Sequence, residues 1–407
     1  MTGKATSTKC KATRLLAAAA MVLATSTTAH AGGINTNTNM SVAFDRTLSR
    51  DAVIAIDGVY FNPAGVVFMS PGWHMAFNYQ LITQKRYIDN IYYPLFNNNK
   101  NNPTSTRHFK GHALAPFFPS FQLAYNWKKF SFQAGAGVGG GGGKCIFDDG
   151  LGSFEKIVSE TAMAASGLAQ TVDASLASRL PASAVAALGA NGFSSDKYFG
   201  KTGAYSETSF MRGRQYYYGV QLGVAYKLTD NLGVFAGARG VYASCNYYGY
   251  VRNITVGNMP LYQVLDPSKT NAADIELNTD QHGFGVTPIL GIDYKLGRWN
   301  FAARYEFKTK MRLKNEGVNQ FPSIGNLSSN LATALVANLQ SADMTAEQAQ
   351  TIATATLTDT KVTQTMSALK TKFDAGIEEA TGEYADGRKI AADLPGILSV
   401  GVGYTPI

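Results

Sequence analysis

Several stretches of the chain alternate apolar and polar side chains residue by residue. From Trp73 the odd positions carry Trp73, Met75, Phe77, Tyr79 and Leu81, and the even ones carry His74, Ala76, Asn78 and Gln80. The same period of two returns in residues 121–127, 130–138, 216–226, 232–245, 284–294, 299–308 and 398–404. This is the period of a β-strand whose two faces meet different surroundings. The pattern therefore predicts eight strands.

The links between these strands alternate between short and long. Lys128-Lys129, Thr229-Asp230-Asn231 and Gly297-Arg298 are short links that predict three antiparallel hairpins. The other four links are far longer than a usual hairpin loop. A soluble sandwich would share the side-chain alternation, whereas outer-membrane barrels also have tight turns on one side and long loops on the other. We therefore predict an all-β fold, a transmembrane antiparallel β-barrel over residues 73–407.

The N-terminus has the features of a secretory signal peptide over residues 1–31. Basic residues precede an apolar run from Leu15 to Ala24, and small residues at Ala29 and Ala31 form a cleavage site. Removing the peptide lowers the formal net charge from +8 to +4, which takes away the main support for nucleic-acid binding. Beyond it no apolar run is long enough for a membrane-spanning helix. Many aromatic residues and glycines (Tyr 21, Phe 22, Gly 41) suit a barrel in the outer membrane.

Between the cleavage site and the first strand, residues 32–72 are too polar and irregular to cross a membrane. They contain the compact turn Asn62-Pro63-Ala64-Gly65, in which proline fixes φ, glycine permits a reversal and asparagine can hydrogen-bond a neighbouring strand. The segment Tyr60 to Val66 resembles the FadL family of outer-membrane channels for long-chain fatty acids and other hydrophobic compounds. The resemblance implies an N-terminal hatch at 32–72 that plugs a larger barrel. An ordinary turn that opens the first strand is the alternative.

The resemblance also implies a mechanism. A hydrophobic molecule would enter from the outer loops and reach a site in the lumen. A movement of the hatch would then release it sideways into the bilayer beside a kinked third strand, without energy input. In the predicted third strand, Gly135, Gly137 and Gly139 are candidates for the kink and lateral opening, because glycine weakens strand pairing. A flexible loop root is the alternative for Gly139 and the glycines that follow it.

Two long insertions, at about 145–208 and 316–393, contain helical patterns. One apolar face carries Leu168, Val172, Leu176 and Leu180. The other follows a capping box at Thr345 and Gln348 and carries Val362, Met366, Leu369 and Phe373. These faces either pack on each other as an external cap or form an apolar groove for incoming molecules.

Arg304, Lys308 and Lys310 are predicted to share the inner face of the seventh strand. They could receive a carboxylate head group, or they could form ion pairs that hold the wall and the hatch. Cys145 and Cys245 lie on strands that are not neighbours, which favours free thiols. No nucleophile elbow and no His-Glu-x-x-His motif is present, so an enzyme is not expected, and no cofactor is indicated. His108 and His112 have the spacing of two metal ligands on a helix, but they lie in an Asn/Pro-rich segment with Gly111 between them, so no metal site is expected.

The last predicted strand ends at Tyr404, without a further closing strand. An eight-stranded barrel is filled by its own side chains and has no room for a hatch. We therefore expect an incomplete barrel, truncated relative to the family it resembles. The leading function is passive transport of fatty acids or similar hydrophobic molecules by a monomer in contact with outer-membrane lipid. A polar-solute porin and a surface adhesin or anchoring barrel are the alternatives.

Overall fold

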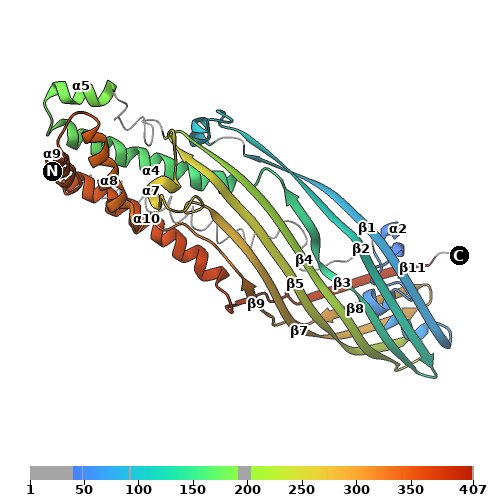
Figure 1. The fold of residues 1–407 in the computed structure, drawn as a ribbon. Helices are drawn as coiled ribbons and strands as arrows, with labels where there is room; N and C mark the ends of the chain where they lie inside the picture. Colours follow the sequence, from blue (N-terminus) through green and yellow to red (C-terminus); the bar gives the residue numbers. More distant parts are fainter. Residues whose placement is uncertain (1–39, 48, 91–92, 191–202, 406–407) are drawn as a thin grey trace, which may run out of the picture.

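The computed structural model describes residues 40–405, except 48, 91–92 and 191–202. The predicted signal peptide and residues 32–39 of the predicted hatch lie outside this range. Eight antiparallel strands follow one another in a single curled sheet that forms an open half-barrel (Figure 1). They are β1 (Gly72–Asn90), β2 (Arg107–Trp127), β3 (Phe130–Phe147), β4 (Tyr205–Lys227), β5 (Leu232–Val256), β7 (Ile275–Leu296), β8 (Trp299–Glu306) and β11 (Ile397–Tyr404). All eight predicted strands and the three short turns are confirmed.

Most of these strands extend well beyond their predicted lengths. β4 has 23 residues and β5 has 25, whereas a tilted strand needs only about 9–11 residues to cross a bilayer. The extra residues lie at the ends of the strands that face the long insertions. The sheet therefore continues past the apolar region and carries the helices at its far end (Figure 1).

The outer face of the sheet exposes a continuous band of large apolar side chains. Trp73 is 71% exposed, Phe77 66% and Leu222 61%, although all three lie on regularly paired strands. The alternate positions, such as Gln122 and Gln221, point inward and are buried. The predicted alternation between two surroundings is confirmed, with the apolar side chains on the outside.

The seventh predicted strand is shorter than the sequence pattern suggested. β8 ends at Glu306, and the chain resumes alongside β7 only as β9 (Arg312–Gly317), which pairs with β10 (Lys389–Ala391). Pro288 of β7 stands opposite Phe307 and has no N–H for a ladder bond. Residues 309–312 instead fold across the inner face, where the absence of side chains at Gly283 and Gly285 permits a close approach.

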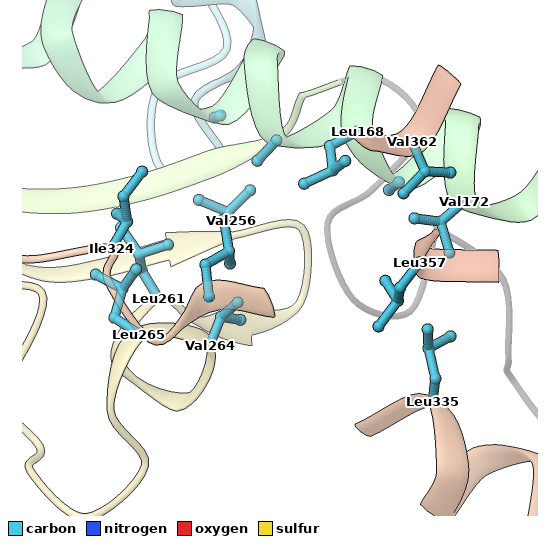
Figure 2. Packing of buried hydrophobic residues seen from close by; sticks show 14 of the residues in the cluster. Leu168, Val172, Val256, Leu261, Val264, Leu265, Ile324, Leu335, Leu357 and Val362 are labelled. Carbon is cyan, nitrogen blue, oxygen red and sulfur yellow. The ribbon is translucent and has the colours of Figure 1, made fainter. Parts of the chain in front are cut away.

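The two long insertions form a helical cap. It contains α4 (Gly152–Ala177), α5 (Ala182–Ala190), α8 (Leu327–Gln340), α9 (Ala346–Leu357) and α10 (Thr360–Tyr384). Leu168 and Val172 of α4 face Val362 of α10 and Leu357 of α9 in one apolar core (Figure 2). The capping box at Thr345 and Gln348 is present. Both predicted helical faces are thus confirmed, and they pack on each other.

The cap is anchored to the sheet by a buried ion pair. Arg107, the first residue of β2, donates to Glu155 of α4 from Nε (2.8 Å) and Nη2 (2.7 Å). Both side chains are at most 6% exposed. Tyr205, the first residue of β4, donates its hydroxyl to the same carboxylate at 3.0 Å. No helix in the described residues combines the length and apolarity needed to cross a membrane.

The remaining short elements lie between these parts. They are α2 (Val42–Thr47), α3 (Gly58–Phe61), the 3-10 helices η1 (Gly65–Phe68) and η2 (Pro94–Asn98), β6 (Met259–Pro260) and α7 (Tyr262–Leu265). Cys145 and Cys245 lie on β3 and β5, which are not neighbours, and both are free thiols, as expected.

Candidate functional site: the N-terminal segment within the curled sheet

Residues 40–47 and 49–69, here called the N-terminal segment, lie against the inner face of the curled sheet. Within it, Arg50 forms a two-bond ion pair with Asp57 (Nε to Oδ2 2.7 Å, Nη2 to Oδ1 2.9 Å). The hydrogen bond to Asp57 raises the pKa of Arg50 above its ordinary value. This pair fixes the loop that leads into α3.

The N-terminal segment contacts all eight strands of the sheet path. Most of these contacts join an inward polar side chain to a main-chain carbonyl of the segment. Gln133 of β3 donates to the Pro63 carbonyl at 2.8 Å, and Gln221 of β4 donates to the Val59 carbonyl at 2.6 Å. The further contacts are with Asn78 of β1, Ser120, Gln122 and Asn126 of β2, Gly233 and Arg239 of β5, Asp293 of β7, Asn300 and Arg304 of β8, and Gly401 and Gly403 of β11.

The turn Asn62-Pro63-Ala64-Gly65 lies at the centre of these contacts and is buried throughout. Asn62 donates from Nδ2 to Oδ2 of Asp293 at 2.6 Å, and its Oδ1 accepts from the Gly65 N–H at 3.2 Å. The same oxygen of Asp293 accepts from Asn300 at 2.8 Å. Ala64 packs in an apolar cluster with Ala225, Phe235 and Ile289 from three strands. The turn is therefore held by the wall on several sides.

Glycine is required at position 65 for a reason other than the predicted backbone reversal. Its φ is not among the positive values in the chain. A Cβ at this position would lie 2.4 Å from Nδ2 of Asn62 and 3.0 Å from Oδ2 of Asp293. The glycine is required because any side chain would collide with the Asn62–Asp293 hydrogen bond.

A buried charge cluster holds Tyr60, which lies two residues before the first residue of the turn. Arg239 of β5 forms a two-bond ion pair with Glu306 of β8 (2.9 and 3.0 Å) and also donates to Gln221 at 2.8 Å. Arg304 lies 3.4 Å from the same carboxylate and donates to the main-chain carbonyl of Tyr60. The Tyr60 ring lies 4.7 Å from the Arg239 guanidinium and 5.3 Å from that of Arg304. Two guanidinium groups, both paired with one carboxylate, thus clamp one aromatic ring.

The three predicted carboxylate-binding residues are not brought together. Arg304 points inward and is 9% exposed at its side chain, as part of the charge cluster. Lys308 lies beyond the end of β8, is 59% exposed and pairs with Asp393 at 2.9 Å. Lys310 is exposed in the same interruption. The predicted common face fails because the strand ends at Glu306.

The candidate kink lies between β2 and β3. Gly135 and Gly137 are in regular register with both neighbours, and both lie close to the N-terminal segment, at Val59 and Met40 respectively. From Ala115 to Pro119 and from Val138 to Gly143 no residue pair joins β2 to β3, although both strands are described throughout. Gly139 lies inside this interruption. Gly141 (φ +93°) and Gly143 (φ +73°) adopt backbone conformations that favour glycine.

A small cavity connects the charge cluster with this interruption. Its wall includes Arg239 and Glu306 at the cluster, Gly139 at the interruption, and Thr309 and Leu394 from the segments that cross the lumen. Sequence reasoning did not single out Arg239 or Asp293. Their inward register positions on predicted strands were the available signal, but no pattern links positions so distant in the sequence.

The described chain is thus a curled antiparallel half-barrel whose inner face holds its own N-terminal segment. Among solved structures it is similar to the toluene transporter TodX of Pseudomonas putida (TM-score 0.34, 15% identity, covering 65% of this chain and 56% of that one). It is also similar to the toluene transporter TbuX of Ralstonia pickettii (TM-score 0.34, 14% identity, covering 65% of this chain and 58% of that one). Both are FadL-type barrels, the family that the Asn62 turn resembles.

The chain spans a little over half the length of these transporters. No protein-family profile matches the sequence, and no curated protein matches it.

Proposed function

We propose that the protein is an outer-membrane channel through which hydrophobic small molecules pass without energy input. The observation that carries this proposal is the N-terminal segment, which contacts the inner face of every strand of the sheet path. Residues 32–72 would then act as a hatch: the segment obstructs the interior, and a molecule can pass only when some of its contacts are released.

The outer face supports the membrane placement. Its band of exposed Trp, Phe, Leu and Val side chains would be unfavourable in contact with water, whereas lipid can surround it without that free-energy cost. Inward polar side chains such as Gln133 and Gln221 bind carbonyls of the N-terminal segment. The same wall therefore explains both the lipid contact and the retention of the hatch.

The path that we propose leads from the cavity beside Arg239 and Glu306 to the interruption between β2 and β3. Pro116 and Pro119 lie in the unpaired part of β2 and have no N–H to donate. The facing part of β3 is rich in glycine, but Phe118 and Val138 pack together between the two strands and would have to move aside. A molecule that leaves sideways through this interruption would not have to break hydrogen bonds between paired residues of β2 and β3.

Arg304 is the one predicted carboxylate-binding residue that lies close to this path. A fatty-acid head group would have to compete there with Glu306, whereas an uncharged hydrocarbon would not. We therefore propose hydrophobic molecules as the substrate class, with fatty acids and aromatic hydrocarbons as its two testable members.

Uptake of labelled oleate and labelled toluene by cells that carry the full gene tests the proposal. The Asn62→Ala variant removes a hydrogen bond to a buried carboxylate, worth about 1.5–3 kcal/mol, and should change uptake severalfold. Asn101→Ala, in an exposed loop, is the matched control and should behave as the unaltered protein. Equal uptake of both compounds by cells with and without the protein would refute a transport function.

A further inference from the structure

Basic side chains gather on the outer face of the sheet, just past the apolar band. Lys144 of β3 stands directly opposite Arg214 of β4 in the register, and Ile146 stands opposite Arg212. On the next strands, Lys85 of β1 pairs with His112 of β2, two residues from Lys110. Lys85, Lys110 and Lys144 are exposed, and Arg212 and Arg214 are half-buried. These five residues, here called the basic row, lie on four neighbouring strands.

The basic row lies at one level above the apolar band. Lys85 follows Trp73 by twelve positions on β1, and Arg214 precedes Tyr226 by twelve positions on β4. Twelve residues of strand tilted by about 40° rise roughly 30 Å, the thickness of a bilayer hydrocarbon core. The row therefore coincides with the boundary between the apolar chains and the head groups of the outer leaflet.

Lys144 and Arg214, at the centre of the row, have no acid opposite them in the register. Like charges directly opposite each other on paired strands are destabilising. No ion pair among the described residues involves Lys144 or Arg214, and Nε of Arg214 is buried without a hydrogen-bond partner. Asp280 accepts from Asn246, which also binds Arg212, and Asp89 pairs with His108. The exposed Asp148 follows β3 directly and lies toward Lys110, four residues beyond Lys144. An external anion between Lys144 and Arg214 would relieve this repulsion.

An apolar surface continues directly from this pair toward the membrane. Tyr216 stacks on Tyr218 with ring centroids 5.7 Å apart, and below them Val220 and Leu222 are 57% and 61% exposed. A soluble anion would use only the charges. A phosphorylated lipid would use both parts of this surface, with its phosphate between the cations and its acyl chains along the apolar side chains.

We propose that the basic row binds the phosphorylated head group of an outer-leaflet lipid, centred on Lys144 and Arg214. This inference rests on the proposed placement in the outer membrane, but not on any transport activity. The bound lipid neutralises the row and seals the outer wall next to the interruption between β2 and β3.

The test uses the purified chain in phosphatidylcholine nanodiscs that contain bisphosphorylated lipid A, with lipid binding measured by native mass spectrometry. A Lys or Arg near a lipid surface contributes about 1 kcal/mol, so Lys144→Gln with Arg214→Gln should lower the affinity about thirtyfold. The control pair Lys128→Gln with Lys129→Gln removes equal charge at the opposite turn, where both lysines are exposed, and should leave the affinity unchanged.

Two further arms identify the source of the phosphate. Dephosphorylated lipid A should bind the unaltered protein as weakly as lipid A binds the double variant. Displacement of lipid A by excess inorganic phosphate would assign the row to a free anion and overturn the proposal. Lys144→Gln alone, at an exposed lysine, should weaken binding about fivefold and serves if the double variant does not fold. Equal affinity for the unaltered protein and Lys144→Gln would also overturn it, whatever the uptake assay shows.

Discussion

Replacing Glu306 by glutamine should release the N-terminal segment from the wall. Glu306 is 5% exposed and, within the described part of the chain, is the one anion in contact with both Arg239 and Arg304, which clamp Tyr60. Removing one partner from a buried charge cluster costs about 3–5 kcal/mol, because the remaining charges stay buried without compensation. Glu306→Gln keeps the shape of the side chain, so the loss is electrostatic. The N-terminal segment carries most of it because its carbonyl and ring complete the cluster.

Hydrogen exchange followed by mass spectrometry measures this release. A loss of about 3 kcal/mol corresponds to roughly hundredfold faster exchange in peptides from residues 58–68, since each 1.4 kcal/mol is a factor of ten. Asp89→Asn, which breaks the exposed pair with His108, is the control and should change local stability by less than about 1 kcal/mol. Unchanged exchange in 58–68, with exchange in β4 and β5 also unchanged, would refute the clamp.

Two further predictions concern the turn and the cap. Gly65→Ala places a methyl group 2.4 Å from Nδ2 of Asn62, and overpacking of this kind costs about 1–3 kcal/mol, so exchange in residues 62–68 should accelerate while the cap helices keep their protection. Asp359 caps α10 by accepting from the Lys361 N–H at 2.9 Å, and this bond holds the pKa of Asp359 below its ordinary value of 3.8. Its stabilising contribution is present above pH 3.8 and is lost as the pH falls through the lower folded-state pKa. Amides of the first turn of α10 should therefore lose protection against exchange as the pH falls below the folded-state pKa of Asp359. The Asp359→Ser variant should show no such loss, because serine does not titrate in this range.

The strands could be predicted because the alternation of apolar and polar side chains is visible within each single segment. Trp73 to Leu81 needs no partner to show a period of two. The helical faces of Leu168 and Val362 were predictable for the same reason. Which of two apolar faces would pack on the other was not fixed by either segment alone, and mutual burial in the cap is a tertiary result.

The parts that depend on facing strands were not predictable in the same way. Lys308 and Lys310 continue the pattern of their own strand, but the strand ends because β7 presents Pro288 opposite Phe307. Similarly, Gly135 and Gly137 look suited to a kink, yet the pairing fails one residue further on, where β2 carries Pro116 and Pro119. In both cases the deciding proline lies on the neighbouring strand.

The unusual length of β4 and β5 determines where a molecule first meets the protein. Only about twelve residues of each strand are needed to cross the hydrocarbon core, and the remaining eleven or more rise roughly 30 Å further. With the proposed placement, the sheet acts as a stalk that holds the helices roughly 30 Å beyond the lipid head groups. A poorly water-soluble compound arriving from outside would then meet the helices before it reaches the head groups.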